Sequence, residues 1–451
     1  MGVRNAFPAP GAVLLALALP FVFLHVHYQP TWTVPLGSTS ATIALSDLAV
    51  LAVGAAGFVA ALRGGFARLR PGGWIWAAGA TLLAFVLAST VWGRSIAADY
   101  RFLTHVVTAL KFSEYALLAL TVPLLVRRLP DAELVVGALV AWSVAASIGA
   151  LLQFLGFVNE FAGRRPGQRE PSFLGTHDLA ALSGATLTLG LAGIALGPLP
   201  RRQRALAAAG GLAGALGLTL SGAVAGVIGI AAAAAVAALL ARLRGHWPSL
   251  ARLAALTGVV VLVTAGVLAL RSANVDVFLR FLGIRPAVHA TSQLEGSSFA
   301  QRVVLGYIGV RIFLDHPLVG IGWQATSERS SYGPYLADAH RRYPDVPDLS
   351  FPSPEHRWGV QDAYIQAAAE LGVVGFVLFL GLFAAGFAVA GLAFGRAPPP
   401  AAFTAAVPIL WLLVTMGVWI GLGLVAGIPL VGLTWLALGF SAAAPALADA
   451  R

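Results

Sequence analysis

The chain has 451 residues, of which 58% are hydrophobic and only 11% are charged, and its mean hydropathy is +0.83. Soluble domains contain about half apolar and about a quarter charged residues, so this composition excludes an ordinary soluble globular protein. The net charge of +10 would allow a nucleic-acid partner, but the placement of the arginines gives that charge a topological origin, so no nucleic acid is expected. The chain has no cysteine, which excludes disulfides and thiolate metal sites.

Apolar runs of about 20 residues recur along the whole chain. A helix of that length crosses about 30 Å of hydrocarbon, and only a helix satisfies its backbone hydrogen bonds within one such run. In chain order, the runs lie near 9–27, 42–62, 73–92, 104–126, 132–157, 179–199, 205–220, 222–241, 253–270, 361–393, 402–421 and 424–444. We therefore predict an all-α polytopic membrane protein with about twelve transmembrane helices, the first of them retained rather than cleaved as a signal peptide.

The arginines divide unequally between the two sides of this helix array. One set of alternate connections holds Arg63, Arg68, Arg70, Arg127, Arg128, Arg201, Arg202, Arg204, Arg242, Arg244, Arg252 and Arg396. The opposite short connections hold Arg94, Arg101, Arg164, Arg165 and Arg169. By the positive-inside rule, the first set and both termini are expected in the cytoplasm.

One connection on the outer side, residues 271–360, is far longer than the others. It divides the chain into helices one to nine (1–270), the outer loop (271–360) and helices ten to twelve (361–451). Loops of this length in compact proteins are functional or disordered. This loop contains an apolar pattern that predicts a short amphipathic helix, formed by Phe299, Val303, Ile308 and Val310. Pro317, Gly320 and Gly322 predict a tight turn after it.

Few ionisable residues lie inside the expected helices, and they bear on the choice between an enzyme and a transporter. Lys111 and Glu114 lie three residues apart, so they share a helix face and can pair, either functionally or as a salt bridge near the interface. Asp47 is expected to meet water. A transporter of a small anion or solute is the alternative function, and it predicts repeats and interrupted helices at mid-membrane. The glycine-rich run 206–226 is a candidate for such an interruption.

Two stretches carry a family resemblance: "QRVVLGYIGVRIFLDHPLVGIGWQ" (301–324) and "QDAYIQAAAELGVVG" (361–375). Together they resemble the core of the O-antigen ligase and O-antigen polymerase family. An arginine-bearing helix leads into an "HPL-G-G" turn, and a later residue pair precedes nine residues, Gly372 and Gly375. Gln361 and Asp362 occupy that pair, where the family's ligases begin with a histidine. Upstream, "RRPGQREPSFLGTHDLAALSG" (164–184) resembles the family's arginine-bearing approach to a helix.

The resemblance implies a glycosyltransferase with a GT-C-like fold and its active site in the large outer loop. It implies a donor glycan linked to a polyprenyl pyrophosphate such as undecaprenyl pyrophosphate, and a glycan or a lipid core as acceptor. Transfer would be inverting, without metal or cofactor, at the outer face of the bacterial cytoplasmic (inner) membrane. A product destined for the cell envelope, such as lipopolysaccharide, is expected. Whether the protein is a ligase or a polymerase stays open.

Arginine suits a departing pyrophosphate, because its planar fork binds phosphate oxygens and keeps its charge. Arg302, in the loop helix, is the best candidate, and the alternatives are an arginine at the membrane interface or a salt bridge to a loop acid. Arg169 matches the upstream family position, followed by Arg165, and each could instead be a solvated loop charge.

Activating an acceptor hydroxyl requires a general base, and histidine suits this role. Because Gln361 does not accept a proton near neutral pH, His356 is predicted to act as the base while Gln361 orients the acceptor. The alternative is that His356 is a plain loop histidine. Asp362 is the fallback base, although a helix N-cap is its expected role.

Four further side chains are candidates for substrate binding. Tyr364 and Trp358 could line a sugar or polyprenyl groove, or anchor the membrane interface. His177 could hydrogen-bond glycan hydroxyls. Asp178 beside it could do the same, although a helix cap is the favoured role for an acid before an apolar run. Acidic pairs are too sparse to indicate a divalent metal, so no metal is predicted.

Overall fold

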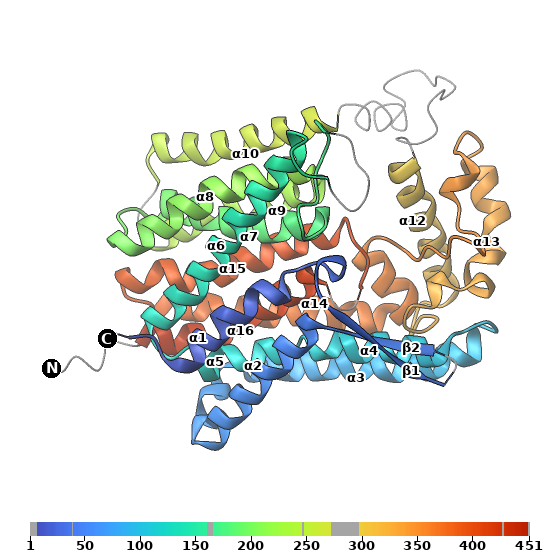
Figure 1. Ribbon diagram of the computed structural model, residues 1–451, viewed down its shortest axis with the longest axis horizontal. Coiled ribbons are helices and arrows are strands. Elements are labelled where there is room, and N and C mark those ends of the chain that lie inside the picture. Colours follow the sequence, from blue (N-terminus) through green and yellow to red (C-terminus); the bar gives the residue numbers. More distant parts are fainter. Residues whose placement is uncertain are drawn as a thin grey trace.

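The computed structural model describes residues 7–37, 39–159, 166–245, 248–271, 297–425 and 428–449. Most of these residues are in helices, and Figure 1 shows the helices packed side by side in one bundle. The described residues contain eleven helical segments long and apolar enough to cross a membrane. The prediction of an all-α polytopic membrane protein is therefore confirmed.

The helices before the long loop are α1 (Pro10–Val22), α2 (Leu45–Leu62), α3 (Gly73–Ile96), α4 (Phe102–Glu114), α5 (Leu117–Leu125), α6 (Leu129–Phe154), α7 (Thr176–Leu196), α8 (Arg201–Ser221), α9 (Val224–Leu243) and α10 (Leu250–Leu270). Those in and after the loop are α12 (Ser297–Asp315), α13 (Arg329–Arg342), α14 (Ala363–Arg396), α15 (Pro399–Trp419) and α16 (Pro429–Asp449). Two antiparallel strands, β1 (Thr31–Leu36) and β2 (Thr39–Ala44), form a hairpin. Helices α4 and α5 together make one candidate span.

The N-terminal region differs from the expectation of a span over residues 9–27. Helix α1 has 13 residues, fewer than the roughly 20 that cross a bilayer. The polar, proline-ended segment "HVHYQP" (25–30) does not continue the helix, and the chain turns into the hairpin of β1 and β2, which the apolar pattern did not predict. The described part of the chain therefore has eleven candidate spans and one short apolar helix, close to the expected number of about twelve.

Small residues allow the central helices to approach closely. A Cβ added to Gly214 of α8 would lie 2.3 Å from the carbonyl oxygen of Ser183 in α7, and one added to Gly417 of α15 would lie 2.5 Å from Cα of Gly229 in α9. Such glycine contacts are typical of helix packing in membranes, where tight van der Waals contact replaces the hydrophobic effect. The same close packing explains why the run 206–226 is rich in glycine. This run forms most of α8, a left-handed turn at Gly222 and the start of α9, so it is not one interrupted helix.

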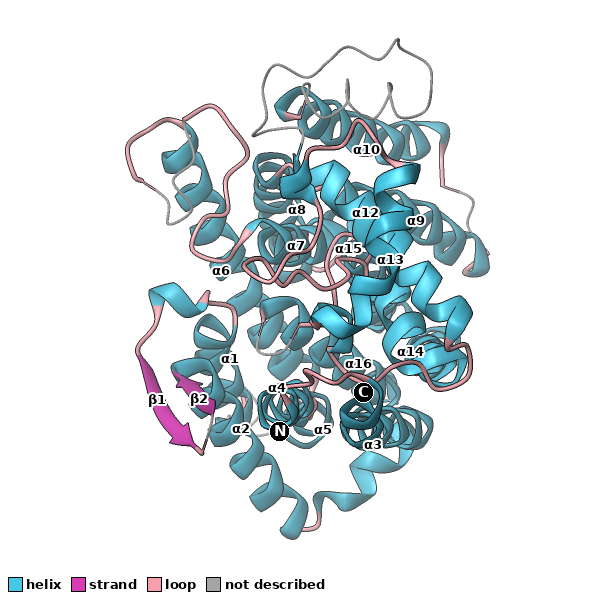
Figure 2. Ribbon diagram, turned by 90° about the vertical axis from the view of Figure 1, so that its right-hand side faces the viewer, coloured by secondary structure: helices cyan, strands magenta, loops and turns pink. Residues whose placement is uncertain are grey.

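Helices α12 and α13 lie at one end of the bundle, and the start of α1 and the end of α16 lie at the other (Figure 1). Figure 2 looks onto the first end and shows α12 and α13 beside α14. A small separate core joins them. The face of α12 in this core consists of Val304, Ile308 and Ile312, at helical spacing, whereas Val310 of the predicted pattern is 43% exposed.

The ion pair inside the bundle also differs from the expectation. Lys111 Nζ lies 2.9 Å from Asp47 Oδ2, so its partner is Asp47 of α2 rather than Glu114 on its own helix. Asp47 is buried, and its Oδ2 also accepts a hydrogen bond from the Ala44 backbone N–H at the start of α2. The prediction that Asp47 meets water is wrong, because the acid both caps its helix and binds a neighbouring one.

Candidate active site

The turn after α12 crosses a break in α14, and this crossing joins the two motifs. At Gly372 the backbone of α14 leaves the helical conformation (φ 67°). The N–H of Val373 donates to the Pro317 carbonyl (2.8 Å), and the N–H of Ile321 donates to the Ala369 carbonyl (3.1 Å). The break in α14 therefore exposes backbone groups that the turn satisfies, which fixes α12 relative to α14.

Glycine is required at the crossing by both conformation and space. Gly320 and Gly322 have φ values of +66° and +102°, in the left-handed region that favours glycine. A Cβ on Gly320 would lie 2.3 Å from the carbonyl carbon of Glu370, and one on Gly372 would lie 2.2 Å from the Leu318 carbonyl oxygen. The glycines of the turn after α12 and of α14 therefore let the backbones of these two segments pack in direct contact.

A buried carboxylate holds the end of this turn. Glu370 is 1% exposed, and it accepts hydrogen bonds from the N–H of Gln324 (2.8 Å), the hydroxyl of Thr326 and the side-chain amide of Gln366 (3.0 Å). Glu370 was not among the residues predicted to form the site. A lone acid within the apolar run "AAAELGVVG" was the signal available.

Arg302 connects three distant segments of the chain at this end of the bundle. Its Nε donates to Oε1 of Gln361 (3.3 Å), just before α14, and its Nη2 donates to Nε2 of His177 (2.8 Å), in the first turn of α7. Arginine carries only donors, so Nε2 of His177 accepts, and the proton of the neutral ring is then on Nδ1. Three sequence-predicted site residues therefore converge.

Positive charge is concentrated around Arg302. Partial burial and then the nearby charge of Arg271, at the end of α10, lower the pKa of Arg302 to about 10. Arg302 therefore stays protonated at neutral pH. Two neighbouring cations in a partly buried setting favour an anion between them.

Arg169 lies in a different place, at the turn between α8 and α9. The N–H of Glu170 donates to the Leu220 carbonyl (2.8 Å), and a Cβ on Gly222 would lie 2.8 Å from Cβ of Arg169. The glycine at this turn therefore leaves room for Arg169 to cross it. Arg165 lies outside the described residues.

The residues around the start of α14 have mixed outcomes. Asp362 caps the helix as expected, accepting from the N–H groups of Tyr364 and Ile365 at 2.9 Å each. The hydroxyl of Tyr364 donates to the Met416 carbonyl (2.7 Å) and so joins α14 to α15. His356 is exposed, and its ring centroid lies 5.1 Å from that of the half-buried Trp358.

A second buried acid anchors the segment that carries His356 and Trp358. The side chain of Glu328 is fully buried and contacts Nε2 of His105 (2.7 Å), Nε of Arg101 (2.9 Å) and Nη1 of Arg357 (3.0 Å). Burial acts to raise the pKa of Glu328, but the hydrogen bonds from His105 and Arg101 outweigh it, so this pKa lies below its usual range. The surrounding sequence "SERSS" contains no signal that identifies Glu328.

Comparison with known proteins identifies the part of the chain that contains this crossing. A search of curated proteins found no match. Residues 209–380 match the family model described as O-antigen ligase. The matched segment includes Arg302, the turn after α12, Gln361 and the break at Gly372, whereas Arg169 and His177 lie before it. The match indicates a glycan-transferring membrane enzyme, and it confirms the resemblance of this chain to the O-antigen ligase and O-antigen polymerase family.

Proposed function

We propose that this protein transfers or polymerises a glycan carried on a polyprenyl pyrophosphate, at the outer face of a bacterial cytoplasmic membrane. The observation that carries the proposal is the joining of Arg302 to Gln361 and His177, beside Arg271. These groups come from α7, α10, α12 and the start of α14, at the end of the bundle that also contains the long loop.

The proposed chemistry needs positive charge and a base. The acceptor hydroxyl oxygen attacks the anomeric carbon, and the bond from that carbon to the pyrophosphate oxygen breaks. The pyrophosphate leaves with the electron pair, and the hydroxyl proton passes to the base, which we propose is His356. Arg302 binds the pyrophosphate as negative charge grows on it. Gln361, fixed by Arg302, orients the acceptor.

Arg169 and His177 have supporting roles in the proposal. Arg169 binds phosphate or glycan oxygens from the α8–α9 side. Arg165, outside the described residues, is proposed to bind the same oxygens. His177 holds the Arg302 guanidinium through Nε2, so that the second edge of the fork faces the donor. Trp358 and Tyr364 offer aromatic surface to the sugar or the polyprenyl chain.

The test is transfer from a synthetic undecaprenyl-pyrophosphate glycan by the protein in proteoliposomes. Arg302→Ala is expected to lower kcat on the order of 100-fold or more, because one donor to a developing anion is lost. Arg302→Lys, which keeps the charge but loses the fork, should retain more activity than Arg302→Ala. Arg311→Ala is the matched control, since Arg311 lies on the same helix and is half exposed beside Asp338.

Two results would contradict the proposal. One is that Arg302→Ala keeps full activity, as the control variant Arg311→Ala does. The other is the absence of glycan transfer together with uptake of a labelled solute by the same proteoliposomes, which would indicate a transporter. Independence of metal remains a prediction, and it requires that EDTA leave the transfer rate unchanged.

A further inference from the structure

A large cavity lies between α7, α8 and α10, away from Arg302. Its volume is about 1140 Å³, above the roughly 300–1,000 Å³ typical of pockets for small molecules. It begins near Leu187 in the middle of α7 and reaches Gly197 and Leu199, beyond the far end of that helix. His177, which contacts Arg302, lies at the opposite end of α7.

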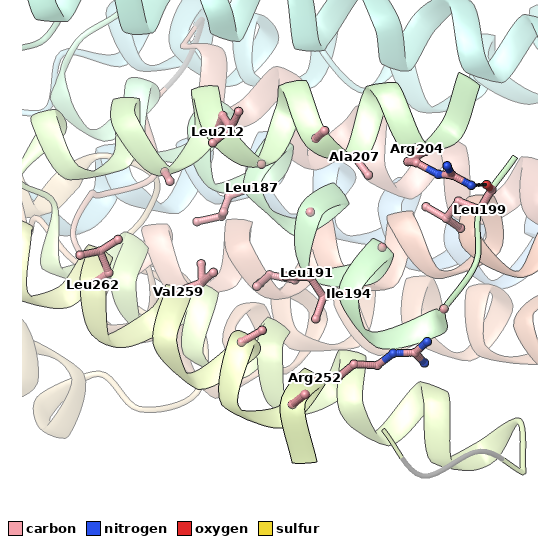
Figure 3. Close-up of a pocket in the computed structure, with 18 of the residues that line it drawn as sticks. Leu187, Leu191, Ile194, Leu199, Arg204, Ala207, Leu212, Arg252, Val259 and Leu262 are labelled. Atoms are coloured by element: carbon pink, nitrogen blue, oxygen red, sulfur yellow. Dashed lines mark hydrogen bonds between the residues drawn. The ribbon is translucent and has the colours of Figure 1, made fainter. Parts of the chain in front are cut away.

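The walls of the cavity are apolar, and the cavity opens sideways. Figure 3 shows Leu187, Leu191 and Ile194 of α7 facing side chains of α8 and α10 across it. Leu212 and Leu262, on its two rims, are 76% and 73% exposed. Around membrane-spanning helices such rims face hydrocarbon, so the cavity is a groove open to lipid chains.

Arg204 of α8 and Arg252 of α10 lie on opposite sides of the groove near the same end, with Leu212 and Leu262 toward the other end (Figure 3). Arg204 Nη2 donates to the Leu199 carbonyl (3.1 Å), and a Cβ on Gly197 would lie 3.3 Å from Nη1 of Arg252. No acidic side chain is among the described residues that line the cavity. Two arginines on either side of one end of an apolar groove complement a lipid phosphate above acyl chains.

Helix α10 leaves this groove poorly filled by protein. Only 17% of its membrane window is buried inside the structure, against 78% for α7. Every other candidate span among the described residues is at least 33% buried. A lipid in the groove would cover the apolar sides of α8 and α10 that the protein leaves open.

We propose that this groove is a binding site for one anionic glycerophospholipid from the leaflet at that end of the bundle. Its phosphate lies between Arg204 and Arg252, and its acyl chains follow α7, α8 and α10 toward mid-membrane. The site is separate from Arg302 and does not depend on the proposed glycan transfer.

Native mass spectrometry of the full chain in detergent, with added dioleoyl phosphatidylglycerol or dioleoyl phosphatidylcholine, tests the charge requirement. One phosphatidylglycerol should be retained in preference to phosphatidylcholine. The double variant Arg204→Gln/Arg252→Gln should weaken its retention by about tenfold or more, because each arginine near a lipid phosphate contributes on the order of 1 kcal/mol. Arg201→Gln/Arg202→Gln removes the same charge from the exposed start of α8 and should retain the lipid.

A second pair of variants tests the groove itself. Ala255→Trp fills the lining of α10, whereas Ala254→Trp places the same ring on an exposed position beside it. Only Ala255→Trp should abolish retention, while both proteins keep the wild-type unfolding temperature.

Three results would overturn the assignment. The first is equal retention of the two phospholipids by the wild-type protein, and the second is unchanged retention by the double arginine variant or by Ala255→Trp. The third is a different occupant of the groove. Displacement of phosphatidylglycerol by equimolar undecaprenyl phosphate would make the polyprenyl lipid that occupant, and a dimer that forms only without lipid would make it a second copy of the chain.

Discussion

Arg302 is held by side chains from two other segments, and the two histidines of the proposed site have different surroundings. His177 accepts a hydrogen bond from Arg302, so protonating Nε2 would break that contact. His356 is exposed on the loop, beside Trp358, and is open to water. A base must exchange protons and a positioning residue must not, which is why we assign the base to His356 and the positioning to His177.

The histidine roles lead to different pH profiles. His356→Ala is expected to lower kcat by about 100-fold or more, the usual contribution of a general base, and to remove the fall in rate on the acid side. His177→Gln should keep that acid limb and raise KM, because Gln can still accept from Arg302.

Measured pH–rate profiles in proteoliposomes separate these outcomes. His340→Ala is the control, because His340 lies in the same loop, stacked on Phe351. Full activity of His356→Ala would refute His356 as the base, and loss of the acid limb in His177→Gln would transfer that role to His177.

At the scale of elements, the crossing of the turn over α14 predicts which glycines matter. Gly372→Ala is expected to destabilise the protein by about 1–3 kcal/mol from the left-handed conformation alone, with a further cost from contact with the Leu318 carbonyl. Gly381→Ala, in the same helix with open space around it, should be neutral or stabilising. Unfolding temperatures in detergent measure both, and an equal effect of the two changes would contradict the packing described for the crossing.

The Glu328 cluster anchors the loop to α4, and it makes the anchorage depend on pH. The folded pKa of Glu328 is depressed, so its stabilisation is present above the usual glutamate range and is lost as pH falls through the folded pKa. Glu328→Gln is expected to cost about 1–3 kcal/mol, since three cationic or ring donors lose a charged acceptor.

Limited proteolysis of the loop across an acidic pH series measures this effect. The wild-type loop should become sensitive at low pH, and Glu328→Gln should be sensitive already at neutral pH. Glu355→Gln, an exposed acid on the same loop, should behave as wild type. A wild-type loop that stays resistant throughout would show that other contacts anchor it.

For the whole molecule, the arginine distribution predicts an orientation that cysteine labelling can test. The chain has no cysteine, so a single introduced thiol carries the entire signal. Ala337→Cys, exposed on α13, should react with an impermeant maleimide in intact spheroplasts. Gly395→Cys, exposed near the end of α14, should react only after permeabilisation. The reverse pattern would invert the topology.

Much of this protein follows from its sequence alone. The apolar runs determined the all-α membrane fold, because span length and hydrophobicity are sums over local residues. Turn chemistry located the break after α12, and the resemblance to the O-antigen ligase and O-antigen polymerase family pointed to Arg302 and Gln361. The short α1 and the β hairpin were missed, because a run of apolar residues does not show where a helix ends.

Contacts between helices were decided only by the tertiary structure. Lys111 pairs with Asp47 of another helix, and His177 contacts Arg302, which lies 125 residues later in the chain. Glu328 contacts basic side chains from both the start of α4 and the loop. Such pairs depend on how each helix is rotated and how closely small residues let it pack, and neither quantity is local to the sequence. The sequence therefore determined which elements form and cross the membrane, whereas packing decided which side chains make the candidate site.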